Sequence, residues 1–437
     1  MRFALALLLV VAPVGLGCGP TERGGTDGGN DMCEGLECRI VKCEQQGKPP
    51  TTISGTVFAP NGTLALYGVN VYIPLSDPGP LEAGLQCSRC TDTLQGGSLV
   101  HVVTDDKGQF TLTNVPSGLN IPIVIQVGKW RRQVTVPNVA DCMDNPMPAA
   151  DTSLPRTKLQ GDIPKMAMVS GLCDELECLM RKIGVADSEF TSDSGTGSIH
   201  LYASNGLNSI GTSQTLSPMT ALWGDMNKLK QYDAVFMSCE CGQNATEKTQ
   251  PMMDNIKAYA DLGGRVFGSH YHNIWIDGKT GGGTGIPTPS PEWTRIASCP
   301  METFDAPATA VIDQMSNPKG AAFAQWMLNV MGSTTLGVVS VVEPRQMCAT
   351  VDKTLAEQWL YASGTNKPQT IQFTTPIETP KDQRCGKVVF TDMHVSGSGS
   401  SPSSPFPNSC ETGPMTPQEK ALAFMVFDIA SCVGQIF

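Results

Sequence analysis

The chain has 437 residues, enough for two or three domains, and a formal net charge of −11. Only 16% of its residues are charged, and 45 glycines and 32 prolines accompany a hydrophobic fraction of 40%, which favours a β-rich protein with long loops over a disordered one. Because an acidic surface repels phosphate backbones, nucleic acid is excluded as a partner. The basic cluster 129–132 is interpreted as the exposed end of a strand.

The first eighteen residues have the pattern of an export signal. Met1-Arg2 precedes an apolar run, residues 3–14, which ends at Gly15-Leu16-Gly17-Cys18. That run is too short to span a bilayer core of about 30 Å. The cysteine after small residues resembles the lipobox of bacterial lipoproteins, in which Cys18 is lipidated and begins the mature chain. The resemblance implies a lipid-anchored envelope protein, on the outer membrane because Gly19 follows the cysteine; a freely secreted protein is the alternative.

Sixteen cysteines in an exported chain indicate disulfides. Residues 19–50 form a glycine-rich tether followed by Cys33, Cys38 and Cys43. A zinc site would need a second cysteine or histidine half-site, so we expect these cysteines to form disulfides with the next domain. If Cys18 carries lipid, fifteen cysteines remain, and at least one is free or pairs between chains.

Residues 51–137 are expected to form a β-sandwich, because short alternating segments are separated by Gly, Pro, Asn and Asp turns. The predicted strands are 53–58, 68–73, 109–113 and 121–127. The motif from Thr104 to Gly118, Thr-Asp-x-x-Gly-x-Phe-x-Leu-x-x-Val-Pro-x-Gly, resembles the carboxypeptidase regulatory-like domain. That family implies an all-β, transthyretin-like sandwich of seven strands without catalysis of its own. An insertion, 76–97, contains Cys87 and Cys90, which we interpret as a loop staple because no thioredoxin-like setting surrounds them.

After a linker, residues 138–165, the hydrophobic period changes and residues 166–437 are expected to form an α/β domain. Strands alternate with helices, which predicts a parallel sheet covered on both faces. The predicted strands are 166–171, 198–202, 232–238, 265–270 and 386–394. The predicted helices are 176–183, 251–262, 323–330 and one that a capping box opens at Thr416.

Polar residues follow several of these strands, where parallel sheets place their ligands. Cys239, Glu240 and Cys241 follow one strand, and His270-Tyr271-His272-Asn273 follows the next. The segment from Leu229 to His270, Leu-x-x-Tyr-Asp-x-Val, a helix and Gly-Gly-Arg-Val-Phe-Gly-Ser-His, resembles the class I glutamine amidotransferase-like superfamily, which has a flavodoxin-like fold. Catalytic members carry a nucleophilic cysteine at a sharp turn, where this chain has His270. That departure resembles the ThuA-like branch, which lacks the nucleophile, so amidotransferase chemistry is not expected.

The strand ends leave three kinds of chemistry open. Carboxylate and imidazole groups can act as general acid and base, and the candidates are Glu240, His270, His272, Asp392 and His394. Cys239 or Cys241 with His270 would form a thiol–imidazole pair, although disulfides are the commoner fate of cysteines in an exported protein.

A divalent metal is the third possibility, with His270, His272 and Glu240 as candidate ligands. Residues two apart in an extended segment point the same way, which permits joint ligation, and imidazole and carboxylate suit zinc. A hydrogen-bonded structural role is the commoner one for such groups. No other cofactor is predicted, because the glycine-rich segment 277–285 lacks the spacing of a phosphate-binding loop.

The whole arrangement resembles a family of large bacterial lipoproteins with a regulatory-like sandwich before an amidotransferase-like domain. We therefore expect an envelope lipoprotein without catalytic activity that binds a carbohydrate or an envelope protein. The alternative is a sugar-directed hydrolase or isomerase with a Glu/His site that acts with or without a bound metal.

Overall fold

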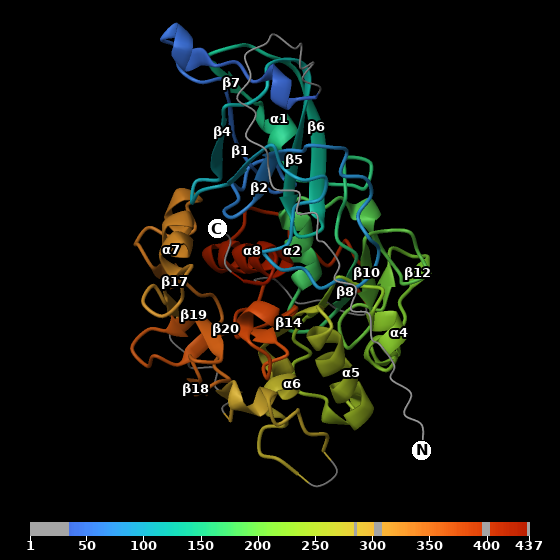
Figure 1. Cartoon of the computed structure of the whole chain (residues 1–437). Helices are drawn as coiled ribbons and strands as arrows, with labels where there is room; N and C mark the ends of the chain where they lie inside the picture. Colours follow the sequence, from blue (N-terminus) through green and yellow to red (C-terminus); the bar gives the residue numbers. More distant parts are fainter. Residues whose placement is uncertain (1–34, 284–285, 301–307, 396–402, 435–437) are drawn as a thin grey trace, which may run out of the picture.

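The computed structural model describes residues 35–283, 286–300, 308–395 and 403–434, and the expected signal peptide, Cys18 and Cys33 lie outside these ranges. Figure 1 shows an N-terminal group of strands at one end of the molecule and a larger body with helices and sheet at the other. The protein is multidomain, and the two parts are described in turn.

The N-terminal part consists of a three-stranded and a four-stranded sheet that share one apolar core. Alternation explains the burial: in β4, Phe110 and Leu112 are buried while their neighbours are exposed. The three-stranded sheet contains β1 (Thr52–Thr56), β4 (Gln109–Thr113) and β7 (Asp144–Pro146), and the four-stranded sheet contains β2 (Asn70–Ile73), β3 (Val100–Val103), β5 (Gly118–Val127) and β6 (Trp130–Val139). Beside the strands lie η1 (Glu37–Arg39), η2 (Cys43–Gln46) and α1 (Ala149–Thr152).

Two details differ from the sequence-based expectation for this part. The paired strands continue beyond residue 137, because β7 pairs in parallel with β1. The basic cluster is not an exposed strand end: Arg131 is only 2% exposed and forms an ion pair with Asp162 at 2.8 Å. Its guanidinium also donates to Gln95 Oε1 and to the carbonyl oxygen of Gly79, which satisfies the buried charge.

The larger part is built on a ten-stranded mixed sheet. Its order is β17-β16-β19-β20-β21-β14-β13-β8-β10-β9, and the strands from β21 to β9 pair in parallel while those from β17 to β21 pair antiparallel. The parallel strands are β8 (Met166–Val169), β9 (Phe190–Thr191), β10 (Ile199–Tyr202), β13 (Ala234–Met237), β14 (Arg265–Ser269) and β21 (Gly386–Thr391). The antiparallel strands are β16 (Thr309–Ile312), β17 (Val338–Ser340), β19 (Ala356–Ala362) and β20 (Pro368–Thr375).

Helices connect these strands. The α-helices are α2 (Leu176–Lys182), α3 (Thr220–Trp223), α4 (Met226–Leu229), α5 (Gln250–Asp261), α6 (Ile274–Asp277), α7 (Gly320–Asn329) and α8 (Pro417–Ala430). The 3-10 helices are η3 (Asp187–Glu189), η4 (Ala245–Glu247), η5 (His270–Asn273), η6 (Trp293–Arg295) and η7 (Lys381–Gln383). Two small pairs complete the structure, β11 (Ser209–Ile210) with β12 (Gln214–Thr215) and β15 (Ala297–Ser298) with β18 (Thr350–Val351).

The parallel strands are buried on both faces, which the alternation of their side chains shows. In β8, Met166 and Met168 belong to the core that contains residues of α2, α7 and α8, whereas Ala167 and Val169 belong to the core that contains residues of α3, α4, α5 and α6. The predicted capping box of α8 is present: Thr416 Oγ1 accepts from the Glu419 backbone N–H, and Glu419 Oε2 accepts from that of Thr416.

The first core continues into the β-sandwich, so the two parts pack directly against each other. The ring of Trp130 lies 5.3 Å from that of Phe427 in α8, and Trp326 Nε1 in α7 donates to the carbonyl oxygen of Ala65 at 2.8 Å. Figure 1 shows α8 between the sandwich strands and the mixed sheet. Contacts through buried aromatic rings favour a fixed arrangement of the two parts.

Disulfides add covalent links between the two parts. Cys87 and Cys90, both in the insertion of the sandwich, bond to Cys385 before β21 and to Cys432 after α8. The expectation that these cysteines form disulfides is confirmed, but they do not close the loop on itself: two separate bonds fasten the insertion to the larger part.

The described residues also contain the disulfides Cys43–Cys142, Cys173–Cys241, Cys178–Cys410 and Cys299–Cys348. This density of disulfides is typical of an exported protein. Within the described ranges, no helix combines the length and the hydropathy needed to cross a membrane.

Candidate functional site

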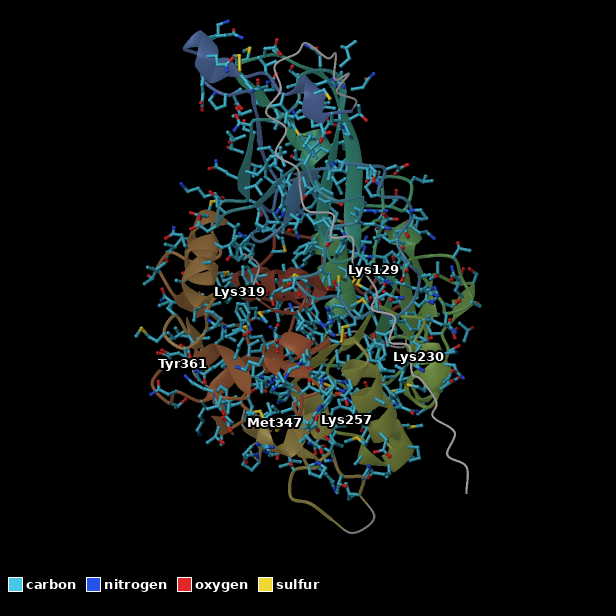
Figure 2. All side chains as sticks on the ribbon, in the orientation of Figure 1. Lys129, Lys230, Lys257, Lys319, Met347 and Tyr361 are labelled. Carbon is cyan, nitrogen blue, oxygen red and sulfur yellow. A yellow bond between two sulfur atoms is a disulfide. The ribbon has the colours of Figure 1, made fainter. Side chains whose placement is uncertain are left out.

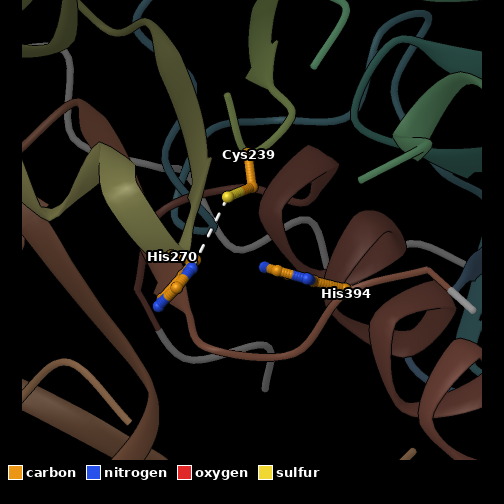
Figure 3. Close-up of side chains that lie close together, drawn as sticks. All are labelled: Cys239, His270 and His394. Carbon is orange, nitrogen blue, oxygen red and sulfur yellow. Dashed lines mark hydrogen bonds between the residues drawn. The ribbon is translucent and has the colours of Figure 1, made fainter. Parts of the chain in front are cut away.

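Three chemically active side chains converge where neighbouring parallel strands end. Cys239 follows β13, His270 follows β14 and His394 follows β21. Their potential ligand atoms all lie within 4.8 Å of one another, and Figure 3 shows the three side chains around one point. The side chains are 0, 1 and 4% exposed, respectively, so the cluster is closed to bulk water.

His270 is the first residue of the short helix η5 and directly follows strand β14, so the chain turns sharply at this residue. Its φ angle is +44°, a left-handed conformation that is uncommon for a residue with a side chain. Such a conformation costs about 1–3 kcal/mol and persists where the surroundings enforce it, often at functional sites. The turn presents the imidazole to Cys239, whose Sγ lies 3.5 Å from His270 Nδ1.

The three side chains have few competing partners. Among the described residues, His270 Nε2 and His394 Nε2 have no hydrogen-bond partner. Cys239 is the free cysteine of the described chain, whereas Cys241, the other thiol candidate, is bonded to Cys173. Because buried polar atoms are normally paired, a nitrogen without a partner on each of these two neighbouring imidazoles is unusual.

Electrostatics argue against a thiolate–imidazolium pair. Burial raises the pKa of the Cys239 thiol to about 12, with a further contribution from the nearby carboxylates of Asp174 and Glu240. Burial, and then the positive charge of Arg345, lowers the pKa of His270 to about 3. Both groups are therefore neutral near pH 7, and a neutral thiol is a weak nucleophile.

The donor types suit a borderline divalent cation such as Zn²⁺, and one donor pair already has the separation that zinc requires, while the three donor atoms together span up to 4.8 Å. Zinc bonds of about 2.3 Å to sulfur and 2.0–2.1 Å to nitrogen at a tetrahedral angle place the two atoms about 3.6 Å apart. Cys239 Sγ and His270 Nδ1 are 3.5 Å apart. A bound cation would remove the thiol proton, which burial alone disfavours, and would engage one nitrogen of each imidazole; bound to His270 through Nδ1, it would leave Nε2 of that ring without a partner.

Asp174 connects the segments that carry these three residues. Its carboxylate accepts from Ser269 Oγ at 2.5 Å and from the Val395 backbone N–H at 2.8 Å, next to His270 and His394 respectively. Burial raises the pKa of this carboxylate to about 6, and the backbone N–H of Cys239 is one of the groups that lower it. One buried side chain after β8 therefore holds the ends of β13, β14 and β21 in register.

Glu240 and His272, two candidates of the sequence analysis, are engaged elsewhere. Glu240 forms a buried ion pair with Lys248 at 2.5 Å and accepts a hydrogen bond from Ser204. His272 Nε2 lies 3.0 Å from the carbonyl oxygen of Ser238, and its Nδ1 accepts from Trp275 Nε1 at 3.0 Å. The expected extended segment is a 3-10 helix, so His270 and His272 do not point the same way.

Asp392 lies close in sequence to the cluster but faces another loop. Its Oδ2 accepts from the Met347 backbone N–H at 2.9 Å, and burial raises its pKa to about 7. Its Oδ1 has no hydrogen-bond partner among the described residues. The structure therefore brings together His270 and His394 of the five candidates and adds Cys239, for which the sequence had suggested only a thiol–imidazole pair with His270.

Comparisons with known proteins do not identify a family. No family model matches the chain, and neither does any curated protein. Solved structures with similarity include a Salmonella typhimurium cytoplasmic protein, 12% identical over 53% of this chain and 88% of that one, with a TM-score of 0.29. A type II cohesin–X-dockerin complex of Acetivibrio cellulolyticus is 17% identical over 33% and 78% of the two chains, with a TM-score of 0.16. The major pilin subunit of Bacillus cereus is 12% identical over 24% of this chain and 30% of that one, with a TM-score of 0.15. These TM-scores are too low to support an argument about fold or function.

Proposed function

We propose that this protein is an envelope-anchored lipoprotein whose α/β part binds a zinc-like divalent cation through Cys239, His270 and His394. The observation that carries the proposal is the convergence of three buried donor groups, within 4.8 Å, at the carboxyl edge of the parallel strands. One thiol and two imidazoles are ligands that Zn²⁺ accepts, and three protein ligands leave one position for a further group.

The topology supports the flavodoxin-like assignment of this part. Numbered along the chain, strands β8, β10, β13, β14 and β21 have the order 2-1-3-4-5 in the sheet. In this order the ligand site lies beside the strands at which the connections change face, outside their carboxyl ends. Cys239 after β13 and Asp174 after β8 occupy that place.

Metal binding is favoured over sugar-directed acid–base catalysis as the primary role. Glu240, the carboxylate that the hydrolase alternative needs, is neutralised by Lys248, and the three donors are almost completely buried. A general acid or base must reach the substrate, and in the described residues these groups face one another. The proposal also includes a lipid anchor at Cys18 and an outer-membrane location. Both rest on the signal-like sequence of the N-terminus.

The test is metal analysis of full-length protein purified from a bacterial membrane, with intact mass measured on the same sample. We expect one zinc per chain and a mass that corresponds to a lipidated Cys18. Cys239→Ser should lose the metal, whereas His101→Ala, a change at an exposed histidine of the sandwich, should retain it. Co²⁺ in place of Zn²⁺ should give thiolate-to-cobalt absorption that disappears in Cys239→Ser.

Two results would overturn the metal site. One is folded wild-type protein that takes up no divalent cation in titration with Zn²⁺. The other is a cation that remains after Cys239→Ser and His270→Ala. An unlipidated mature chain would refute the anchor and leave the metal site standing.

A further inference from the structure

A cavity of about 830 Å³ lies between the β-sandwich and the antiparallel half of the mixed sheet. The sandwich contributes Tyr67 and Thr104, and its insertion contributes Arg89. The sheet contributes Glu357 of β19, Gln372 of β20 and the start of β21. We call this space the interdomain cavity; it is separate from the Cys239 cluster, none of whose residues line it.

The interdomain cavity concentrates positive charge in an acidic protein. Five basic side chains line it, against the two carboxylates of Glu357 and Asp382, although the chain has a net charge of −11; one of the five, Lys387, is buried, and this burial lowers its pKa to about 7. The basic residues are Arg89, Lys319, Lys353, Lys381 and Lys387. Figure 2 shows Lys319 at the level where the sandwich meets the larger part. Because basic groups outnumber the carboxylates in this lining, the cavity favours ligands that carry negative charge.

Protein carboxylates balance only some of these cations. Asp428 forms ion pairs with Lys319 at 2.5 Å and Lys387 at 3.6 Å, and Asp313 forms one with Lys353 at 2.7 Å. Arg89 and Lys381 form no ion pair among the described residues.

The Arg89 side chain is half-buried and largely unsatisfied. Its Nε has no hydrogen-bond partner in the described chain, and Nη2 has only a long contact, 3.9 Å, with the sulfur of Cys385. A guanidinium in this state is available for a carboxylate, which it can bind through two parallel hydrogen bonds.

Disulfides fix the position of Arg89. It lies between Cys87 and Cys90, whose bonds to Cys385 and Cys432 fasten this short segment to the α/β part. Backbone hydrogen bonds of 2.9 Å between Ser88 or Cys90 and Val433 add to the constraint. Because the segment is already ordered, a ligand does not have to offset the entropy of ordering it.

Other groups in the wall are suited to hydroxyl groups and to a sugar ring. Gln372 Oε1 is buried and has no hydrogen-bond partner among the described residues, so it needs a donor that an acid group alone cannot supply. Tyr67, half-buried and stacked on Phe424 at 6.0 Å, offers an aromatic surface with a polar end. The volume is within the range of about 300–1,000 Å³ for small-ligand pockets.

We propose that the interdomain cavity binds an acidic oligosaccharide, with Arg89 and Lys381 bound to its carboxylates and Gln372 to a hydroxyl group. This inference is independent of the metal site. It assigns the carbohydrate-binding role to the junction of the two parts, where the sandwich supplies one wall and the mixed sheet the other.

The experiment is isothermal titration of the full chain with trigalacturonic acid, with neutral maltotriose as the matched control ligand. We expect trigalacturonic acid to bind and maltotriose to bind at least tenfold more weakly. The double variant Arg89→Ala, Lys381→Ala should lose at least tenfold in affinity for trigalacturonic acid. Asp382→Ala, which removes a repelling carboxylate, should bind it more tightly.

Lys107→Ala, at an exposed turn of the sandwich, is the control and should bind as the wild type does. Lys381 is exposed, so Lys381→Ala alone tests the proposal if the double variant does not fold, with a loss of about threefold expected. Cys239→Ser should leave sugar binding intact. The proposal is refuted by equal affinity for the two trisaccharides, or by unchanged affinity in folded Lys381→Ala and the double variant.

Discussion

Asp174→Ala is the change that most directly tests how the candidate metal site is held. The substitution removes the acceptor for Ser269 Oγ, at 2.5 Å, for the Val395 N–H, at 2.8 Å, and for the Glu175 N–H, at 2.9 Å. Each buried donor left without a partner costs about 1–3 kcal/mol. Removal of the carboxylate also relieves its own burial cost, so we expect a net loss of about 1–4 kcal/mol in the free energy of unfolding.

The effect of this change on metal binding should be larger than its effect on stability suggests. Ser269 and Val395 are the sequence neighbours of His270 and His394, so loss of Asp174 frees both ligand-bearing segments together. Removal of a group that orients metal ligands typically costs about 10–100-fold in affinity. We expect Asp174→Ala to weaken Zn²⁺ binding by that factor, and Asp174→Asn, which keeps an acceptor for Val395, to weaken it less.

The assay is competition for Zn²⁺ with a chromogenic chelator, combined with urea unfolding of the metal-free protein. The control is Asp313→Ala, because Asp313 is also buried and accepts from the backbone N–H groups of Met315 and Ser316, but lies after β16 in the antiparallel half. Asp313→Ala should reduce stability and leave Zn²⁺ affinity unchanged. Unchanged affinity in Asp174→Ala, or an equal loss in both variants, would refute the positioning role.

Three further predictions concern stability. Replacing both Cys87 and Cys385 by serine should lower the free energy of unfolding by about 2–4 kcal/mol and expose the insertion to proteases. An unchanged midpoint of urea unfolding would contradict the stabilising role of this bond. Lys248→Met should lower the free energy of unfolding by about 3–5 kcal/mol, because it leaves the buried Glu240 carboxylate without its ion-pair partner. The Zn²⁺ affinity of this variant should be unchanged. Burial and neighbouring carboxylates raise the pKa of Glu175 to about 7, so the wild type should lose stability as the pH rises from about 4.5 to 7. Allowing for solvent screening, Glu175→Gln should recover about 1–2 kcal/mol at pH 8 and flatten that profile; identical pH profiles would exclude this cause.

The predictable part of the fold followed from local patterns. Alternation in residues 109–113 gave β4 with its observed bounds, and the capping box at Thr416 placed the start of α8. Such signals depend on neighbours within a few residues, so the sequence carries them completely. The edge strand β7 was missed because three residues with one proline have no periodicity, and only pairing with β1 makes them a strand.

For the candidate site, the sequence identified the edge of the sheet but not the set of residues. His270 and His394 were candidates because both follow buried strands, and the tertiary structure brings these two side chains together. The sequence could not show that Cys239 remains free while Cys241 is bonded to Cys173, since parity does not assign pairs. One signal was available: Cys239, like His270, comes within two residues of the end of its strand.

The sequence by itself determined the export pattern, the many disulfides, the alternating strands and the polar strand ends, because each depends on residue type and short spacing. Only the tertiary structure decided which polar groups stay unpaired. Lys248 neutralises Glu240. Both ring nitrogens of His272 are hydrogen-bonded, to Ser238 and to Trp275. The turn at His270, in contrast, directs its ring to Cys239. Pairing of this kind depends on which strands are neighbours in the sheet, and that order is a property of the whole fold.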